Sequence, residues 1–156
     1  MNARIFRFLA AVAVVVALTA SADASAPAGR YVVTSGGTGN GTVYDTKTKL
    51  TWQQTVPSTT YTWANAKTYC GSAAVSTSLG GTGWRLPTLK ELQTIVDGSR
   101  FAPSIYQGAF LSAAGDNHWS STPSVPVPSS AWAVDFGVGF AAYSDASSAY
   151  HVRCVH

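Results

Sequence analysis

Residues 83–98 read GWRLPTLKELQTIVDG and hold the densest local pattern in the 156-residue chain. Thr88 and Glu91 have the spacing of a capping box, in which each side chain accepts a hydrogen bond from the other residue's backbone N–H. Apolar residues at 89, 92, 95 and 96 follow at helical spacing, and an Asp-Gly pair ends the run. Pro87 favours an extended approach to the cap. The stretch therefore predicts a helix that begins after Thr88.

The Trp84-Arg85 pair that precedes this helix has two interpretations. Arg85 could contact an anionic ligand. A Trp and an Arg beside the start of a helix more often pack and pair within the protein, and we interpret the pair as structural. On this interpretation the stretch forms a frame, and the functional site lies elsewhere.

The rest of the pattern predicts an α+β domain with two helices. Apolar residues at 63, 66 and 70 predict the first helix over residues 62–70, with Thr62 as N-cap and Gly71 as stop. The Ser- and Gly-rich residues 72–83 predict an irregular connection, and residues 99–115 a long loop. Strand patterns cover residues 31–34, 42–45 and 50–54 before the helices, and 118–122, 130–136, 140–143 and 150–155 after them. Residues 42–45 and 50–54 predict a hairpin, residues 137–139 predict a hairpin turn, and residues 123–129, with three prolines, predict a loop. This order favours helices packed on a small antiparallel sheet rather than an alternating β-α array.

The first 24 residues have the order of a secretory signal peptide. Arg4 and Arg7 precede an apolar run over residues 8–18, and Ala22-Asp23-Ala24 offers a cleavage pattern. The run is much shorter than the roughly 20 residues of a membrane-spanning helix. No cysteine lies near the cleavage point, so we expect no lipid anchor. We expect residues 1–24 to be removed, residues 25–30 to form a linker and residues 31–156 to form one secreted or periplasmic domain.

Charge excludes several classes of partner. Residues 25–156 retain eight basic and six acidic residues, for a net charge of about +2. This excess is too small to indicate nucleic acid or an anionic membrane. We therefore expect no nucleic-acid binding and no membrane insertion after the signal peptide is removed.

Cys70 and Cys154 are the only cysteines in the chain. In an oxidising compartment an even pair indicates one disulfide. Metal ligation and a nucleophilic thiol are the alternatives, but neither cysteine has the C-x-x-C spacing. The bridge would tie the end of the first helix to the last predicted strand.

These motifs, in this order, resemble one known family. The matching stretches are TVYD at 42–45 with LTWQ at 50–53, WRLPTLKEL at 84–92, WSS at 119–121, AWAVDF at 131–136 and VRCV at 152–155. The resemblance is to the bacterial exported domain named after the C-terminal domain of the Legionella collagen-like adhesin. That family is similar to C-type-lectin-like domains, which implies two helices, a small antiparallel sheet, a long loop and a disulfide where Cys70 and Cys154 lie. It implies a binding module, in some members an adhesin for sulfated glycans, and no defined reaction. Arg153 is the only Lys or Arg after Arg100, which argues against a sulfated ligand here.

An enzymatic alternative rests on Asp116, His118 and Ser120, which would share one face of an extended strand. A catalytic triad requires a base on the nucleophile and a carboxylate on the base. Nothing in the sequence indicates that orientation, and we expect no enzymatic activity. Asp116-Asn117, Asp135 and Asp145 form the best candidate set for calcium, but they lack the Glu-Pro-Asn and Trp-Asn-Asp motifs of calcium-dependent lectins. We therefore expect no metal and no cofactor.

We expect binding to a saccharide or cell-surface ligand through the loops and strands after residue 115. Sugar faces stack on aromatic rings while polar side chains bond to the hydroxyl groups. The candidate ligand-binding residues are Asn117, His118, Tyr143, Asp145, Tyr150 and His151. The residues assigned to the frame are Trp84, Arg85, Pro87, Thr88, Glu91, Trp119, Trp132 and Phe136. A subunit of an envelope or pilus-like assembly is the alternative function, so the partner would be a glycan or an envelope protein, and self-association is left open.

Overall fold

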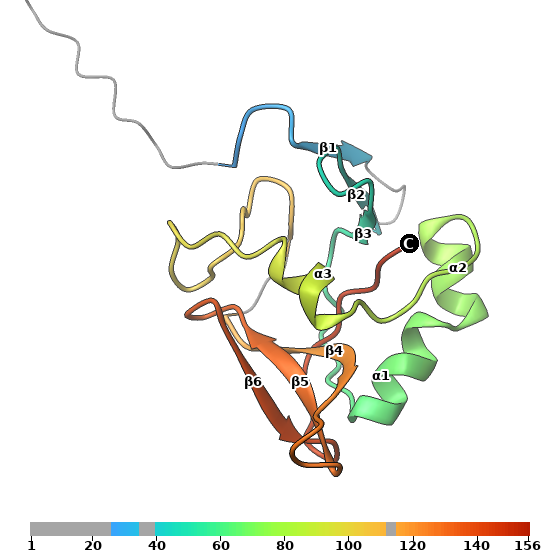
Figure 1. Cartoon of the computed structure of the whole chain (residues 1–156). Helices are drawn as coiled ribbons and strands as arrows, with labels where there is room; N and C mark the ends of the chain where they lie inside the picture. Colours follow the sequence, from blue (N-terminus) through green and yellow to red (C-terminus); the bar gives the residue numbers. More distant parts are fainter. Residues whose placement is uncertain (1–25, 35–39, 112–114) are drawn as a thin grey trace, which may run out of the picture.

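The computed structural model describes residues 26–34, 40–111 and 115–156. The predicted signal peptide lies outside these residues, as do most of the Gly-rich turn before residue 41 and the end of the long loop. The described chain folds into two three-stranded antiparallel sheets with three helices (Figure 1). This arrangement confirms the α+β class. Two sheets and three helices replace the single sheet and two helices expected from the sequence.

The first sheet has the order β1 (Tyr31–Thr34), β2 (Thr42–Asp45), β3 (Thr51–Gln53). The predicted hairpin between β2 and β3 is confirmed, with Val43 opposite Trp52. Asp45 is fully buried at its turn, where its carboxylate accepts hydrogen bonds from Lys47 N and from the Arg30 guanidinium. Burial of Asp45 opposes its ionisation, but these hydrogen bonds prevail and hold the pKa of the carboxyl below its usual value.

The second sheet has the order β4 (Asn117–Pro123), β5 (Ser130–Asp135), β6 (Phe140–Asp145). The predicted turn between β5 and β6 is confirmed, and Gly139 adopts the positive φ of 78° that favours glycine. The register between β4 and β5 shifts between Trp119 and Pro123. The predicted loop over residues 123–129 is confirmed for residues 124–129, whereas Pro123 is the last residue of β4.

Helix α1 (Trp63–Cys70) and helix α3 (Leu89–Gln93) are the two helices that the sequence predicted. The capping box of α3 is present in full, but the α-helix ends before residues 95 and 96 of the apolar stripe. Helix α2 (Ala73–Leu79) was not predicted, because its Ala- and Ser-rich residues carry no apolar stripe and only Val75 is buried. Its N-cap is Ser72, whose hydroxyl accepts a hydrogen bond from Val75 N.

The prediction of a strand over residues 150–155 is wrong. The segment forms isolated bridges to several different parts of the chain, so no neighbouring strand pairs with it continuously. It passes from the second sheet to the C-terminus beside the first sheet (Figure 1). Its bridges join Tyr150 to Tyr61, His151 to His118, and Val155 to both Trp52 and Arg85.

This C-terminal segment separates two hydrophobic cores. Its residues alternate, so that Val155 packs into one core with the first sheet and α3 while Val152 and Cys154 pack into the other with α1 and α2. Trp119 and Phe136 are fully buried in these cores. The disulfide is confirmed between Cys70 and Cys154, whose Cα atoms are 5.4 Å apart. It joins the end of α1 to the segment between the cores. Within the described ranges, no helix is long and apolar enough to cross a membrane.

Candidate functional site

A polar pocket of about 290 Å³ lies where the C-terminal segment leaves the second sheet. Three of the six predicted ligand-binding residues, Asn117, Tyr150 and His151, line it. Thr60, Asp116 and Ala149 complete the lining. We call this cavity the His151 pocket.

Backbone hydrogen bonds bring three distant segments together at the His151 pocket. Tyr61 and Tyr150 exchange two backbone bonds, of 2.8 and 3.0 Å, and this antiparallel bridge places Thr60 beside His151. His151 N donates to Asn117 O at 3.0 Å, and Trp119 N donates to His151 O at 3.0 Å. The pocket is therefore held by the same bridges that replace a regular C-terminal strand.

The side chains of His151 and Asp116 face each other across this site. His151 Nε2 lies 3.6 Å from Asp116 Oδ2, and the Asp116 side chain is 66% exposed. The Tyr150 ring packs on Trp119 with centroids 4.6 Å apart, and its hydroxyl donates to Ser144 Oγ at 3.1 Å. Tyr150 is thus fixed at both ends, while the Asp116 carboxylate remains open to solvent.

His118 lies behind the pocket rather than in its lining. Its side chain is fully buried, its ring centroid is 5.5 Å from that of His151, and its Nδ1 is hydrogen bonded to Asp116 O at 2.9 Å. Burial, with a smaller contribution from the Arg153 charge, lowers the pKa of His118 to about 3. The ring is therefore neutral at physiological pH and supports His151 from the interior.

Tyr143 and Asp145 lie on the opposite face of the second sheet from Asn117. In the cross-strand register Asn117 pairs with Asp135, which pairs with Phe140, and Tyr143 is an odd number of residues further along β6. Tyr143 packs edge-on against the half-buried Trp132, with centroids 5.6 Å apart. Asp145 accepts hydrogen bonds from the backbone N–H and hydroxyl of Ser147. The structure therefore divides the six predicted residues between two faces.

The proposed triad of Asp116, His118 and Ser120 is not assembled. His118 bonds to the backbone carbonyl of Asp116 rather than to its carboxylate, and His118 Nε2 has no hydrogen-bond partner. Ser120 is fully buried, and its hydroxyl donates to Trp132 O at 2.7 Å. The hydroxyl is thus unavailable to a substrate in solution.

Residues of the 83–98 stretch make contacts within the protein, as expected for a structural role. Trp84 is buried and its Nε1 donates to Gly80 O, while Arg85 makes two hydrogen bonds to Glu91, of 2.8 and 2.6 Å. The hydrogen bonds from Arg85, together with those from Thr88, lower the pKa of Glu91 to about 2 against the opposing effect of burial.

Arg153 is a buried cation at the centre of the molecule. It is fully buried, and its guanidinium donates to Gln53 O at 2.7 Å and to Gln54 O at 2.6 Å. Burial lowers the pKa of Arg153 to about 9. It is therefore a structural residue and cannot reach a ligand at the surface.

Sequence reasoning missed Thr60 and Ala149 as lining residues, and considered Asp116 only for catalysis or calcium. No local signal marks Thr60, because it reaches the site through the Tyr61–Tyr150 bridge. Among the described residues, no group of three or more His, Cys, Asp and Glu side chains is placed to hold a metal ion.

Comparison with known proteins gives the class of this domain. Residues 41–156 match the model of the Lcl C-terminal domain, a span that includes the disulfide and the whole His151 pocket. The chain belongs to the Lcl C-terminal domain family, as its motifs indicated. No curated protein matches the chain.

Proposed function

We propose that the protein is an exported, non-enzymatic binding module that recognises a saccharide of a glycan or cell-surface ligand in the His151 pocket. One observation carries the proposal: Asn117, Tyr150 and His151, expected from the sequence to bind a ligand, line one polar pocket. Thr60 and Asp116 add a hydroxyl and a carboxylate to it. The site thus combines an amide, a hydroxyl, a carboxylate and an imidazole, which suit the paired donors and acceptors of sugar hydroxyl groups.

The charge of the site favours an uncharged sugar over a sulfated one. The pocket lining contains the Asp116 carboxylate and neither Lys nor Arg. Arg153 is the only basic Lys or Arg after residue 100, and it is fully buried. A sulfate group would therefore meet a negative charge without the basic residues that usually bind it.

A C-type-lectin-like arrangement is part of the same proposal. Helices α1 and α3 pack against opposite faces of the second sheet, since Ala66 of α1 shares a core with Trp119 and Leu92 of α3 shares one with Val134. The disulfide from α1 to the C-terminal segment agrees with the bridge implied by that resemblance. Secretion or a periplasmic location is supported by the sequence of residues 1–24 and by the disulfide, which persists in oxidising compartments.

The experiment is a glycan array on the oxidised domain, with and without EDTA, followed by titration of the bound sugar. We expect an uncharged glycan to bind in both conditions. His151→Ala and Asn117→Ala should each weaken binding by about tenfold, because a hydrogen bond lost from a site is worth about 1 kcal/mol or more. Tyr143→Ala, on the opposite face, is the matched control and should bind like the wild type. Equal binding by His151→Ala and wild type would contradict the assigned pocket.

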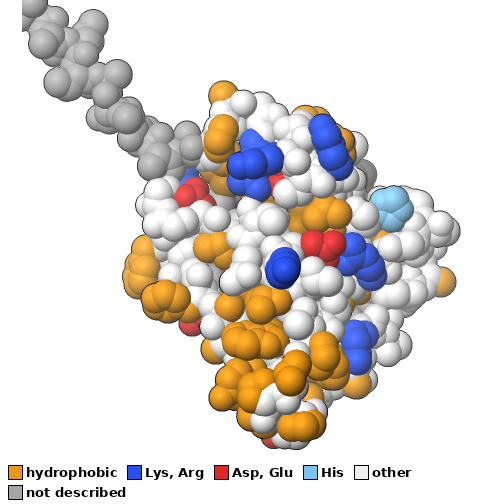
Figure 2. Space-filling view, viewed as in Figure 1, with side chains coloured by type: hydrophobic (Ala, Val, Ile, Leu, Met, Phe, Trp, Pro, Cys, Tyr) orange, Lys and Arg blue, Asp and Glu red, His pale blue; other side chains and the backbone are white. Residues whose placement is uncertain are grey.

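The exposed edge of the second sheet favours the alternative of an assembly subunit. β6 is an edge strand, and its Phe140 and Tyr143 are 72% and 47% exposed. Hydrophobic side chains gather over the region of β5 and β6 in the lower part of Figure 2. Light scattering after size exclusion tests this alternative: a monomer at all concentrations opposes it, and an oligomer that Phe140→Ser dissociates supports it.

A further inference from the structure

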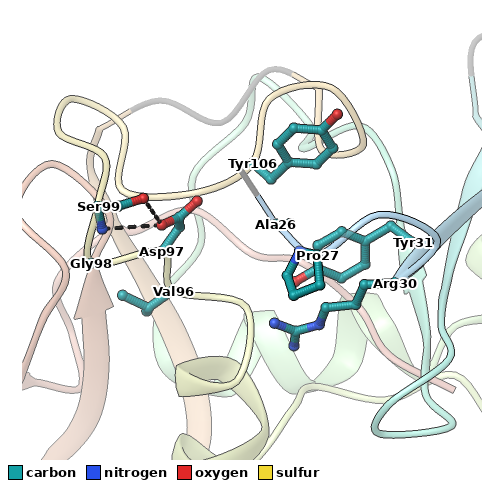
Figure 3. A pocket seen from close by; sticks show the side chains of 9 residues that line it. All are labelled: Ala26, Pro27, Arg30, Tyr31, Val96, Asp97, Gly98, Ser99 and Tyr106. Atoms are coloured by element: carbon teal, nitrogen blue, oxygen red, sulfur yellow. Dashed lines mark hydrogen bonds between the residues drawn. The ribbon is translucent and has the colours of Figure 1, made fainter. Parts of the chain in front are cut away.

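A second cavity, of about 220 Å³, shares no lining residue with the His151 pocket (Figure 3). Its lining comes from the turn before β1, the segment after α3 and the long loop. The lining residues are Ala26, Pro27, Arg30, Tyr31, Val96, Asp97, Gly98, Ser99 and Tyr106. We call this cavity the Tyr31 pocket. Part of its wall, residues 26–31, lies outside the residues 41–156 that match the family model.

Two tyrosine rings form the apolar side of the Tyr31 pocket. The rings of Tyr31 and Tyr106 are 6.2 Å apart between centroids and inclined by 14°. Phe110 packs edge-on against Tyr31 at 5.0 Å, and the Arg100 guanidinium lies 5.3 Å from the centre of the Tyr106 ring. Both tyrosine rings are therefore held in place before any ligand arrives, which reduces the entropy lost on binding.

Polar groups face the rings from the other side of the cavity. Figure 3 shows Asp97 and Ser99 opposite Tyr31 and Tyr106. The Asp97 carboxylate accepts hydrogen bonds from Ser99 N at 3.1 Å and from the Ser99 hydroxyl on Oδ1, and from Arg100 Nε at 2.9 Å on Oδ2. A carboxylate has about four lone-pair positions, so it can accept a further hydrogen bond from a ligand.

The charges around the cavity are already paired. Asp97 is bridged to Arg100, and Arg30 is bridged to Asp45 at 2.8 Å and also donates to Thr94 O at 2.7 Å. A charged ligand would have to compete with these internal ion pairs. An uncharged ligand with hydroxyl groups would donate to a remaining lone pair of the Asp97 carboxylate and leave the ion pairs intact.

We propose that the Tyr31 pocket binds a single uncharged sugar ring, with its C–H face on Tyr31 and Tyr106 and a hydroxyl group donating to the Asp97 carboxylate. The cavity is smaller than the roughly 300 to 1,000 Å³ of sites for drug-sized ligands, which matches one ring rather than a chain of rings. This second site extends the proposed saccharide recognition, but its geometry is independent of the His151 pocket.

The test is a titration of the oxidised domain followed by NMR chemical shifts. The neutral probes are the methyl glycosides of glucose, galactose, mannose and N-acetylglucosamine, and the charged probes are glucuronic acid and glucosamine. We expect at least one neutral probe to shift the signals of Tyr31, Asp97 and Tyr106, with an affinity that does not change with salt because no net charge is transferred. Tyr106→Leu keeps the apolar volume but removes the aromatic face, so binding should weaken by about threefold to tenfold. Tyr106→Phe should bind like the wild type.

Three outcomes would overturn this proposal. The first is no shift at these residues at probe concentrations up to about 0.1 M, where a ligand with a Kd of about 1 mM is saturated. The second is stronger binding of a charged probe, and the third is equal binding by Tyr106→Leu and the wild type. His151→Ala separates the two sites, since it should leave binding at Tyr31 and Tyr106 unchanged whether or not the His151 pocket binds a sugar.

Discussion

The segment that leads into α3 and the C-terminal segment lie side by side. The first is held by contacts close in the sequence, and the second by contacts distant in the sequence. Arg85 and Val155 exchange two backbone hydrogen bonds of 2.9 Å. The contacts of Arg85 and Thr88 with Glu91 lie within six positions along the chain. Arg153, by contrast, bonds to carbonyl groups 100 and 99 positions away. One segment is therefore stabilised locally, and the other joins distant parts of the fold and positions the His151 pocket. This contrast predicts large effects for changes in the C-terminal segment and small ones for matched changes near α3.

Removal of the disulfide should have the largest effect. The bridge spans a sequence separation of 84 residues. The double variant Cys70→Ala/Cys154→Ala should lose about 4 to 5 kcal/mol of unfolding free energy, because the open chain gains conformational entropy in the unfolded state. Urea unfolding of the variant and the wild type measures the difference. A loss below about 1 kcal/mol would show that the C-terminal segment is held without the bridge.

Arg153→Met and Arg85→Met form a matched pair for the second prediction. Arg153→Met should lose about 3 kcal/mol, because the buried carbonyl groups of Gln53 and Gln54 are left without their donor. Arg85 is 46% exposed in its ion pair with Glu91, so Arg85→Met should lose about 1 kcal/mol or less. Chemical denaturation of both variants compares the two costs. Similar losses would remove the distinction between the two segments.

The pH dependence of stability gives the third prediction, through His118. Its folded pKa of about 3 is below the ordinary 6.5, so the unfolded state takes up a proton first as the pH falls. His118 should therefore lower the unfolding free energy progressively as the pH falls below about 6.5 toward 3. His118→Asn keeps a donor near Asp116 O without a titratable ring. Thermal unfolding between these pH values should show a shallower slope for this variant, and an unchanged slope would contradict a buried neutral ring.

Glu91→Gln, in the same ion pair before α3, should have a similarly small effect. The folded pKa of Glu91, about 2, is below its ordinary 4.5, so its contribution is present above pH 4.5 and disappears as the pH falls toward 2. Because its partner Arg85 is 46% exposed, solvent screening limits the loss to about 1 kcal/mol at neutral pH. Denaturant unfolding at pH 7 and pH 2.5 measures this loss. The variant should have a lower unfolding free energy than the wild type at pH 7 and nearly the same one at pH 2.5. A constant difference would exclude the ion pair as its source.

The sequence predicted those parts of the fold whose signals are local. The capping box of α3, the β2–β3 hairpin and the β5–β6 turn each depend on residues a few positions apart. Helix α2 was missed because its side chains are small and only Val75 is buried. The C-terminal segment was assigned to a strand because its alternation is real, but that alternation divides it between two cores rather than between a core and solvent.

The candidate site was predicted in part for the same reason. The sequence placed the site in the segments after residue 115, and three of its predicted residues lie next to other lining residues along the chain. These are Asn117, beside Asp116, and Tyr150 and His151, which follow Ala149. Thr60 comes from a distant segment, and Tyr143 faces away because the pleat of β6 places it on the opposite side of the sheet. The burial of His118 depends on the packing of Phe136 against its ring, with centroids 4.9 Å apart, and no short pattern reports such a contact.

The most direct test of the central claim is an NMR map of the binding site for the glycan selected on the array. The oxidised domain is titrated with that glycan while backbone and side-chain shifts are followed. We predict that the largest shifts fall on Asn117, Tyr150 and His151, and that His151→Ala reduces the shifts at the same glycan concentration because it binds about tenfold more weakly. Shifts centred on Trp132 and Tyr143, on the opposite face of the second sheet, would contradict the assignment of the ligand to the His151 pocket.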